Sequence, residues 1–262
     1  MTPTLFITGD SFSYLSSEDT QERIWSVALS KKLNYNLINQ SDYGVSQDWS
    51  WSVINDWQLK ITRDDQLVVV LTDPARFWFF KDLPKLSNSF IINFENIINN
   101  PDRVKAAEYY IRYIQRAELD IQFLAHRLGW LNNLVRIKEW KKPIIILGFD
   151  QFIPNLDNYP DLLISKGNLA SVSKNEEFNN TTKRGVDARY NHLALRNHDI
   201  LVNKLFKSIV TGHNLDLTTE FESHFFDNLF LENFQEELSP AYINTYLNTS
   251  PEIKPSWHKR LK

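Results

Sequence analysis

Short, uninterrupted runs of apolar and β-branched residues recur along the chain and predict strands that are buried on both faces. The segments between them carry apolar positions every three or four residues, as on one face of a helix. Strands spaced in this way pair in parallel through helical crossovers. The longest of the helices is expected to break near Gly129. The expected strands cover residues 4–8, 36–39, 67–71 and 143–147, and the expected helices cover 20–33, 49–61, 102–138 and 194–210.

Two stretches do not fit this alternation of strands and helices. Residues 77–101 are rich in Phe, Ile and Asn and are interpreted as an inserted cover. Residues 151–190 are interpreted as a long polar connection, and loops of that length are often functional. The sequence therefore predicts one α/β domain over residues 1–212, a three-layer sandwich, followed by a carboxyl-terminal extension over residues 213–262.

Composition and charge exclude several classes of protein. The chain has 262 residues, of which 42% are hydrophobic and 23% charged, as in a soluble globular protein. A net charge of −3 does not favour nucleic acid or an acidic membrane as a partner. The absence of cysteine excludes disulfides and thiolate catalysis. No apolar run is long enough for a membrane span and no leader pattern is seen, so a cytoplasmic protein is expected.

The first expected strand ends in Gly9-Asp10-Ser11. Glycine permits a tight turn there, and it places a serine just past the carboxyl end of the strand. Ligands of open α/β sheets bind at that edge. Ser11 is therefore a candidate nucleophile, although a turn serine that caps the next segment is the alternative interpretation.

A serine nucleophile requires a base, an orienting acid and donors for the developing oxyanion. Residues of these types occur next to the expected strand ends. Gly44 follows the second strand, and the segment Thr72-Asp-Pro-Ala-Arg76 follows the third. Asp187 and His192 precede the last expected helix.

In these blocks the chain resembles the GDSL, or SGNH, hydrolase superfamily. The resemblance implies that Ser11 is the nucleophile, that the amides of Ser11 and Gly44 contribute to the oxyanion hole, and that His192 is the catalytic base. It also implies a flavodoxin-like sheet of about five parallel strands in the order 2-1-3-4-5, and hydrolysis of acyl or acetyl esters, O-acetylated carbohydrate included. Within the superfamily, the segments around Thr72 and His192 are similar to SGNH-like proteins of tailed phages.

The chain departs from the family pattern in two blocks. The third block of the family carries an asparagine that donates to the oxyanion, whereas Thr72 and Asp73 stand here and are the expected third-block members of the oxyanion hole. Either Thr72 donates in place of the asparagine, or the hole depends on the amides of Ser11 and Gly44, because an ionised Asp73 would repel the charge. The family's acid lies three residues before the histidine, whereas Asp187 lies five before His192. These departures support an alternative in another class, a non-catalytic binding or structural protein with the SGNH fold, such as a phage accessory protein.

Further residues near these blocks are candidates for substrate binding. Trp49 and Trp78 are expected either in the core or in a wall that binds the sugar or acyl group. Arg76 is expected to contact substrate or to pair with Asp73. His198 competes with His192 but falls inside the last helix, where a half-buried structural histidine is expected. The dispersed histidines and the lack of a glycine-rich phosphate loop predict no metal and no cofactor.

Overall fold

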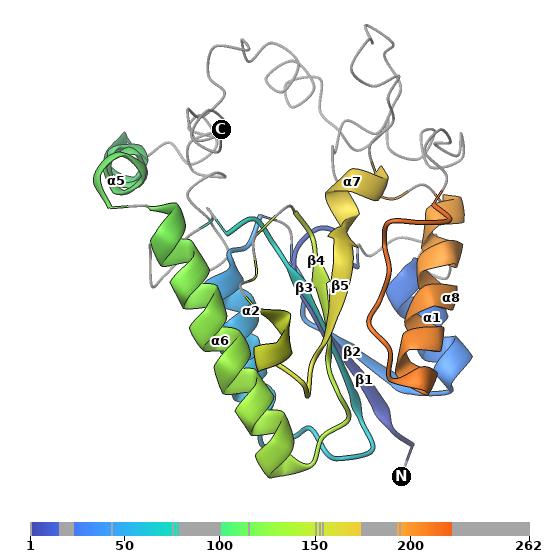
Figure 1. Ribbon diagram of the computed structural model, residues 1–262. Helices are drawn as coiled ribbons and strands as arrows, with labels where there is room; N and C mark the ends of the chain where they lie inside the picture. Colours follow the sequence, from blue (N-terminus) through green and yellow to red (C-terminus); the bar gives the residue numbers. More distant parts are fainter. Residues whose placement is uncertain are drawn as a thin grey trace, which may run out of the picture.

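The computed structural model describes residues 2–15, 24–42, 44–74, 76, 78, 101–114, 116–149, 151, 153, 155–173, 193 and 195–221. A sheet of five parallel strands lies at its centre, in the order β2-β1-β3-β4-β5 (Figure 1). This confirms the predicted α/β class and the strand order implied by the resemblance. The strands are β1 (Thr4–Thr8), β2 (Asn36–Asn39), β3 (Gln66–Leu71), β4 (Ile144–Leu147) and β5 (Leu163–Asn168).

Helices cover both faces of the sheet and make it the middle of three layers (Figure 1). The crossovers between parallel strands place the helices there. One face packs against α2 and α6, and the other packs against α1 and α8. Four helices form these layers: α1 (Trp25–Leu33), α2 (Gln47–Trp57), α6 (Ala117–Lys138) and α8 (Leu195–Thr211).

The strand side chains divide between two hydrophobic cores. Along β3, Leu67 and Val69 point into the core beneath α2 and α6. Val68 and Val70 point into the core beneath α1 and α8. All six residues of β3 are buried, which explains why the five that follow Gln66 are continuously apolar instead of alternating.

The expected break near Gly129 is wrong. The helical stretch divides earlier, between α5 (Pro101–Tyr113) and α6, and Gly129 lies inside α6. One glycine in a helix costs about 1 kcal/mol relative to alanine. Burial of Leu124 and Leu128 on the same helix outweighs that cost.

The interpretation of residues 151–190 as one polar connection is also wrong. The 3-10 helix η2 (Leu156–Asn158), the strand β5 and the short helix α7 (Leu169–Ser173) lie within it. Most of residues 77–101, the expected cover, lie outside the described residues.

The start of the expected carboxyl-terminal extension packs against the sheet. Asp216 forms a parallel bridge with Lys166 of β5. Leu215 and Leu217, on either side of Asp216, are buried. The α/β domain therefore includes residues up to at least Leu217.

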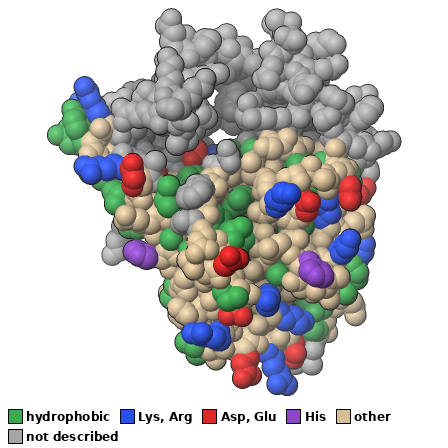
Figure 2. Space-filling model, viewed as in Figure 1, with side chains coloured by type: hydrophobic (Ala, Val, Ile, Leu, Met, Phe, Trp, Pro, Cys, Tyr) green, Lys and Arg blue, Asp and Glu red, His purple; other side chains and the backbone are tan. Residues whose placement is uncertain are grey.

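The surface of the described part is mixed in charge. Figure 2 shows acidic and basic side chains interspersed on the face in view, with no large patch of one sign. None of the described helices has the length and apolar character that crossing a bilayer would require.

Candidate active site

Gly9 allows the chain to leave β1 in close contact with β3. A Cβ built on Gly9 would lie 2.6 Å from the Cβ of Val70 and 2.8 Å from its carbonyl oxygen. Real side chains do not tolerate such contacts, so either the turn or β3 would have to move. The glycine of Gly9-Asp10-Ser11 is therefore required by packing, and it brings Ser11 to the carboxyl edge of the sheet.

Replacing Gly9 with alanine is expected to destabilise the protein by roughly 1–3 kcal/mol, because overpacking shifts backbone in a tight site. Gly129→Ala is the matched control, since a Cβ there meets nothing within 4 Å. The control is expected to be neutral or to stabilise the helix by up to about 1 kcal/mol. Urea unfolding of both variants measures the difference, and equal stability would contradict the role assigned to Gly9.

A tight turn follows Gly9 and presents Ser11. The backbone amides of Ser13 and Tyr14 both donate to the carbonyl of Asp10, each at 3.0 Å. Asp10, Phe12 and Ser13 are buried, whereas Ser11 is partly exposed. The turn therefore buries the neighbours of Ser11 and leaves Ser11 partly exposed at the carboxyl edge of the sheet.

Two side chains from the helical layer hold this turn. The indole Nε1 of Trp25 donates to the carbonyl of Phe12 at 2.7 Å. The backbone amide of Trp25, the first residue of α1, donates in turn to Nδ1 of His198 at 3.3 Å. His198 is buried in α8. This position matches the interpretation of His198 as a structural histidine.

Asp10 and Arg76 form a charged pair behind the turn. Oδ1 of Asp10 accepts from the amide of Phe12 at 3.1 Å, and Oδ2 lies 3.7 Å from Nη1 of Arg76. The same Nη1 donates to the hydroxyl of Thr72 at 2.9 Å. Burial raises the pKa of Asp10 above its usual range, while the charge of Arg76 and the hydroxyl of Thr72 act to lower it. The guanidinium also lies over the ring of Phe149, 5.3 Å from its centroid.

The loop after β2 lies beside the Ser11 turn. The amide of Asp42 donates to the carbonyl of Gly9 at 3.1 Å, and the side-chain amide of Asn39 donates to the carbonyl of Ser13 at 2.7 Å. Gly44 has a φ of 69°, a left-handed conformation that favours glycine. Asn39 is a positioning residue that the sequence analysis did not single out, although it stands at the end of a predicted strand.

A second polar contact joins the ends of β3 and β4. The side-chain amide of Gln47 donates to the carbonyl of Thr72 and to Oε1 of Gln151, each at 2.9 Å. Neither glutamine was predicted from sequence, because their pairing depends on the arrangement of three separate segments. In the same region Trp49 and Trp78 pack edge to face, with centroids 6.3 Å apart.

The structure thus brings several predicted site residues to one edge of the sheet. Ser11 follows β1, Gly44 follows β2, and Thr72, Asp73 and Arg76 follow β3. Asp187 and His192, the expected acid and base, lie outside the described residues. Among the described residues, no group of three His, Asp or Glu side chains could hold a metal ion.

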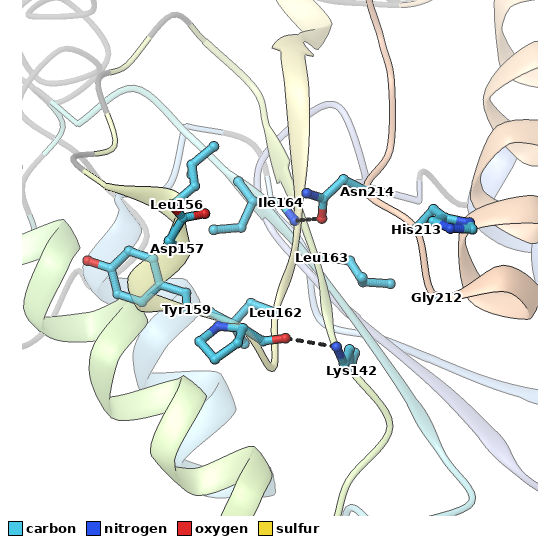
Figure 3. Close-up of a pocket in the computed structure, with 11 residues that line it drawn as sticks. Lys142, Leu156, Asp157, Tyr159, Leu162, Leu163, Ile164, Gly212, His213 and Asn214 are labelled. Carbon is cyan, nitrogen blue, oxygen red and sulfur yellow. Dashed lines mark hydrogen bonds between the residues drawn. The ribbon is translucent and has the colours of Figure 1, made fainter.

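A cavity of about 360 Å³ lies elsewhere, along the beginning of β5 (Figure 3). Leu163 and Ile164 of β5 contribute to its wall, and Gly212, His213 and Asn214 line it where α8 ends. This end of the sheet is opposite to the edge that carries Ser11. The cavity is therefore separate from the candidate active site.

Comparison with known proteins gave structural matches alone. No family model and no curated protein matches the chain. Among solved structures it is similar to TesA (15% identity, 78% of this chain and 97% of that chain, TM-score 0.42). It is also similar to a member of the lipolytic protein G-D-S-L family from Veillonella parvula DSM 2008 (10% identity, covering 90% of this chain and 85% of that chain, TM-score 0.34). A third match is LAE5, an alpha/beta hydrolase enzyme from the metagenome of Lake Arreo, Spain (11% identity, covering 80% of this chain and 97% of that chain, TM-score 0.42). With TM-scores below 0.5, these likenesses do not assign an activity to this chain.

Proposed function

We propose that the protein is a serine esterase that hydrolyses acyl or acetyl esters through an acyl-enzyme on Ser11. The observation that carries this proposal is the placement of Ser11. It is a partly exposed serine between buried neighbours, at the carboxyl end of β1 in a parallel sheet of order 2-1-3-4-5. In sheets of this kind ligands bind at that edge, near the point where the strand order reverses.

In the proposed reaction, Oγ of Ser11 attacks the ester carbonyl while His192 takes the hydroxyl proton. His192 then gives that proton to the departing alcohol, and water hydrolyses the acyl-enzyme by the reverse sequence of proton transfers. Asp187 would orient His192. The pair Trp49 and Trp78 would provide an aromatic wall for the acyl group or for an O-acetylated sugar.

The burial of Thr72 bears on the oxyanion hole. Thr72 is fully buried and its hydroxyl accepts from Arg76. The hydroxyl also donates its own proton in a hydrogen bond to the carboxyl group of Asp10. This favours the backbone amides of Ser11 and Gly44 as the oxyanion donors. Preorganised amides can stabilise a tetrahedral intermediate without a side-chain donor.

Labelling with a fluorophosphonate probe tests the proposed function, because the probe reacts with activated serines. The wild-type protein and the Ser13→Ala variant are expected to be labelled, and Ser11→Ala is not. Ser13 is a suitable control because it is buried and its hydroxyl donates to the carbonyl of Asp10 at 3.1 Å. An unlabelled wild-type protein would instead favour a non-catalytic binding protein, the candidate that the altered third block supports.

Asp73 provides a test of the third block. It is partly exposed at the end of β3, where an ionised carboxylate would repel the developing oxyanion. Asp73→Asn is therefore expected to keep or raise kcat for p-nitrophenyl acetate. A large loss of kcat in a folded variant would give the Asp73 carboxylate a positive role in the reaction.

A further inference from the structure

We propose that Arg76 is a positioning residue, which holds the Ser11 turn through Asp10 and Phe149 and does not contact the substrate. The proposal rests on the proposed esterase function and adds to it. Arg76 reaches the turn in two ways, one by charge and one by packing.

The charged route runs through the residue next to Ser11. The Arg76 side chain is 15% exposed and that of Asp10 is fully buried, so their attraction at 3.7 Å is poorly screened by water. The other oxygen of Asp10 accepts from the amide of Phe12. A carboxylate makes a stronger acceptor than a neutral carboxyl group, so Arg76 strengthens the contact that closes the turn around Ser11.

The packing route runs through two rings. The guanidinium of Arg76 lies over Phe149, which follows β4. Phe149 packs edge to face against Phe12, with centroids 5.8 Å apart. Phe12 directly follows Ser11, so the two routes reach the residues on either side of the candidate nucleophile.

The remaining contact of Arg76 anchors it to β3. Its Nη1 donates to the Thr72 hydroxyl, and Thr72 is itself fixed because its carbonyl accepts from Gln47. Arg76 therefore connects the rigid end of β3 with the turn after β1. Asp10, Thr72 and Phe149 thus engage Nη1 and one face of the guanidinium, while the buried Nε has no hydrogen-bond partner among the described residues.

Removal of the Arg76 charge would leave a buried carboxylate unpaired. Among the described residues, Arg76 is the charged group that acts on the pKa of Asp10, and it lowers that pKa against the effect of burial. Without Arg76, Asp10 would take up a proton at a higher pH than in the wild-type protein. The contact from the Phe12 amide would then weaken, and the turn would lose its fixed geometry.

Kinetic measurements on Arg76→Met and Arg76→Lys test the proposal through the pH dependence of kcat. For Arg76→Met the acidic limb of the profile is expected to move to higher pH, with kcat reduced tenfold or more at the acidic end of the profile and KM nearly unchanged. Arg76→Lys keeps the charge and is expected to restore much of kcat. Arg136→Met is the matched control, because Arg136 is exposed in the last turn of α6, donates to Asn133 of the same helix, and its loss should leave both constants unchanged.

A spectroscopic measurement tests the same proposal without catalysis. The indole N–H of Trp25 donates to the carbonyl of Phe12, so its NMR signal reports on the turn. In Arg76→Met this signal is expected to change with pH at a higher midpoint than in the wild type and in Arg136→Met. An unaltered midpoint would overturn the proposal, as would a raised KM with unchanged kcat, which would make Arg76 a substrate contact. Failure of the esterase function itself would appear separately, as an unlabelled wild-type protein.

Discussion

Ser11→Ala is expected to reduce the hydrolysis of p-nitrophenyl acetate by roughly a thousandfold or more, because the variant cannot form the acyl-enzyme. Its stability should stay within about 0.5 kcal/mol of the wild type, since surface substitutions away from special contacts change stability little. Ser11 is partly exposed, and the contacts that close its turn are made by Asp10, Phe12 and Ser13. Initial rates and urea unfolding, measured on the same preparations, give both quantities.

The matched variant Ser13→Ala separates the nucleophile from the turn that carries it. Ser13 is buried and its hydroxyl donates to the Asp10 carbonyl, so its loss should cost some stability and leave most of the activity. If Ser11→Ala turned over the ester as fast as the wild type, Ser11 would not be the nucleophile. A comparable loss in both variants would show that the assay responds to the shape of the turn.

His192→Ala is expected to lose activity, whereas His198→Ala is expected to lose stability. Removal of a general base from a serine hydrolase costs several orders of magnitude in rate. His192→Ala should therefore be nearly inactive with normal stability. His198→Ala would leave the buried amide of Trp25 without the Nδ1 acceptor, and an unsatisfied buried donor costs roughly 1–3 kcal/mol. That variant should lose stability more than turnover.

Asp187→Asn extends the same comparison to the orienting acid. In Asp187→Asn kcat should fall, but less than in His192→Ala, because the acid acts through the histidine. A fully active Asp187→Asn would reduce the site to a Ser-His pair. If His198→Ala were well folded but inactive while His192→Ala kept its activity, the catalytic base would be His198 and not His192.

The bounds of β1, β2, β3 and β4 all lie within one residue of those expected from the sequence. β3 and β4 are buried along their whole length, and apart from Gln66 their residues are apolar, so each stands out as an uninterrupted apolar run. β5 was missed because its sequence, Leu-Ile-Ser-Lys-Gly-Asn, begins with two large apolar residues and continues with polar residues and glycine. Its polar half pairs with residues that come later in the chain, which no local pattern indicates.

In the candidate site, too, positions next to the strand ends could be predicted, whereas contacts between residues distant in sequence could not. That Ser11, Gly44 and Thr72 lie at one edge could be predicted, because parallel strands all end at the same edge. The contact of Arg76 with Asp10 could not, since the two are far apart in sequence and an acid at Asp73 is the nearer candidate partner. Packing at the strand ends decides that pairing.

Residues 215–217, which follow α8, cover part of the edge of the sheet that β5 forms. An uncovered edge strand presents free amides and carbonyls to which a strand of another molecule can bind, and this leads to aggregation. Here the amide of Lys166 donates to the carbonyl of Leu215, and the amide of Leu217 donates back to the carbonyl of Lys166. A chain shortened to residue 212 would lose this covering segment and would expose the edge of β5 to association with other copies of the protein.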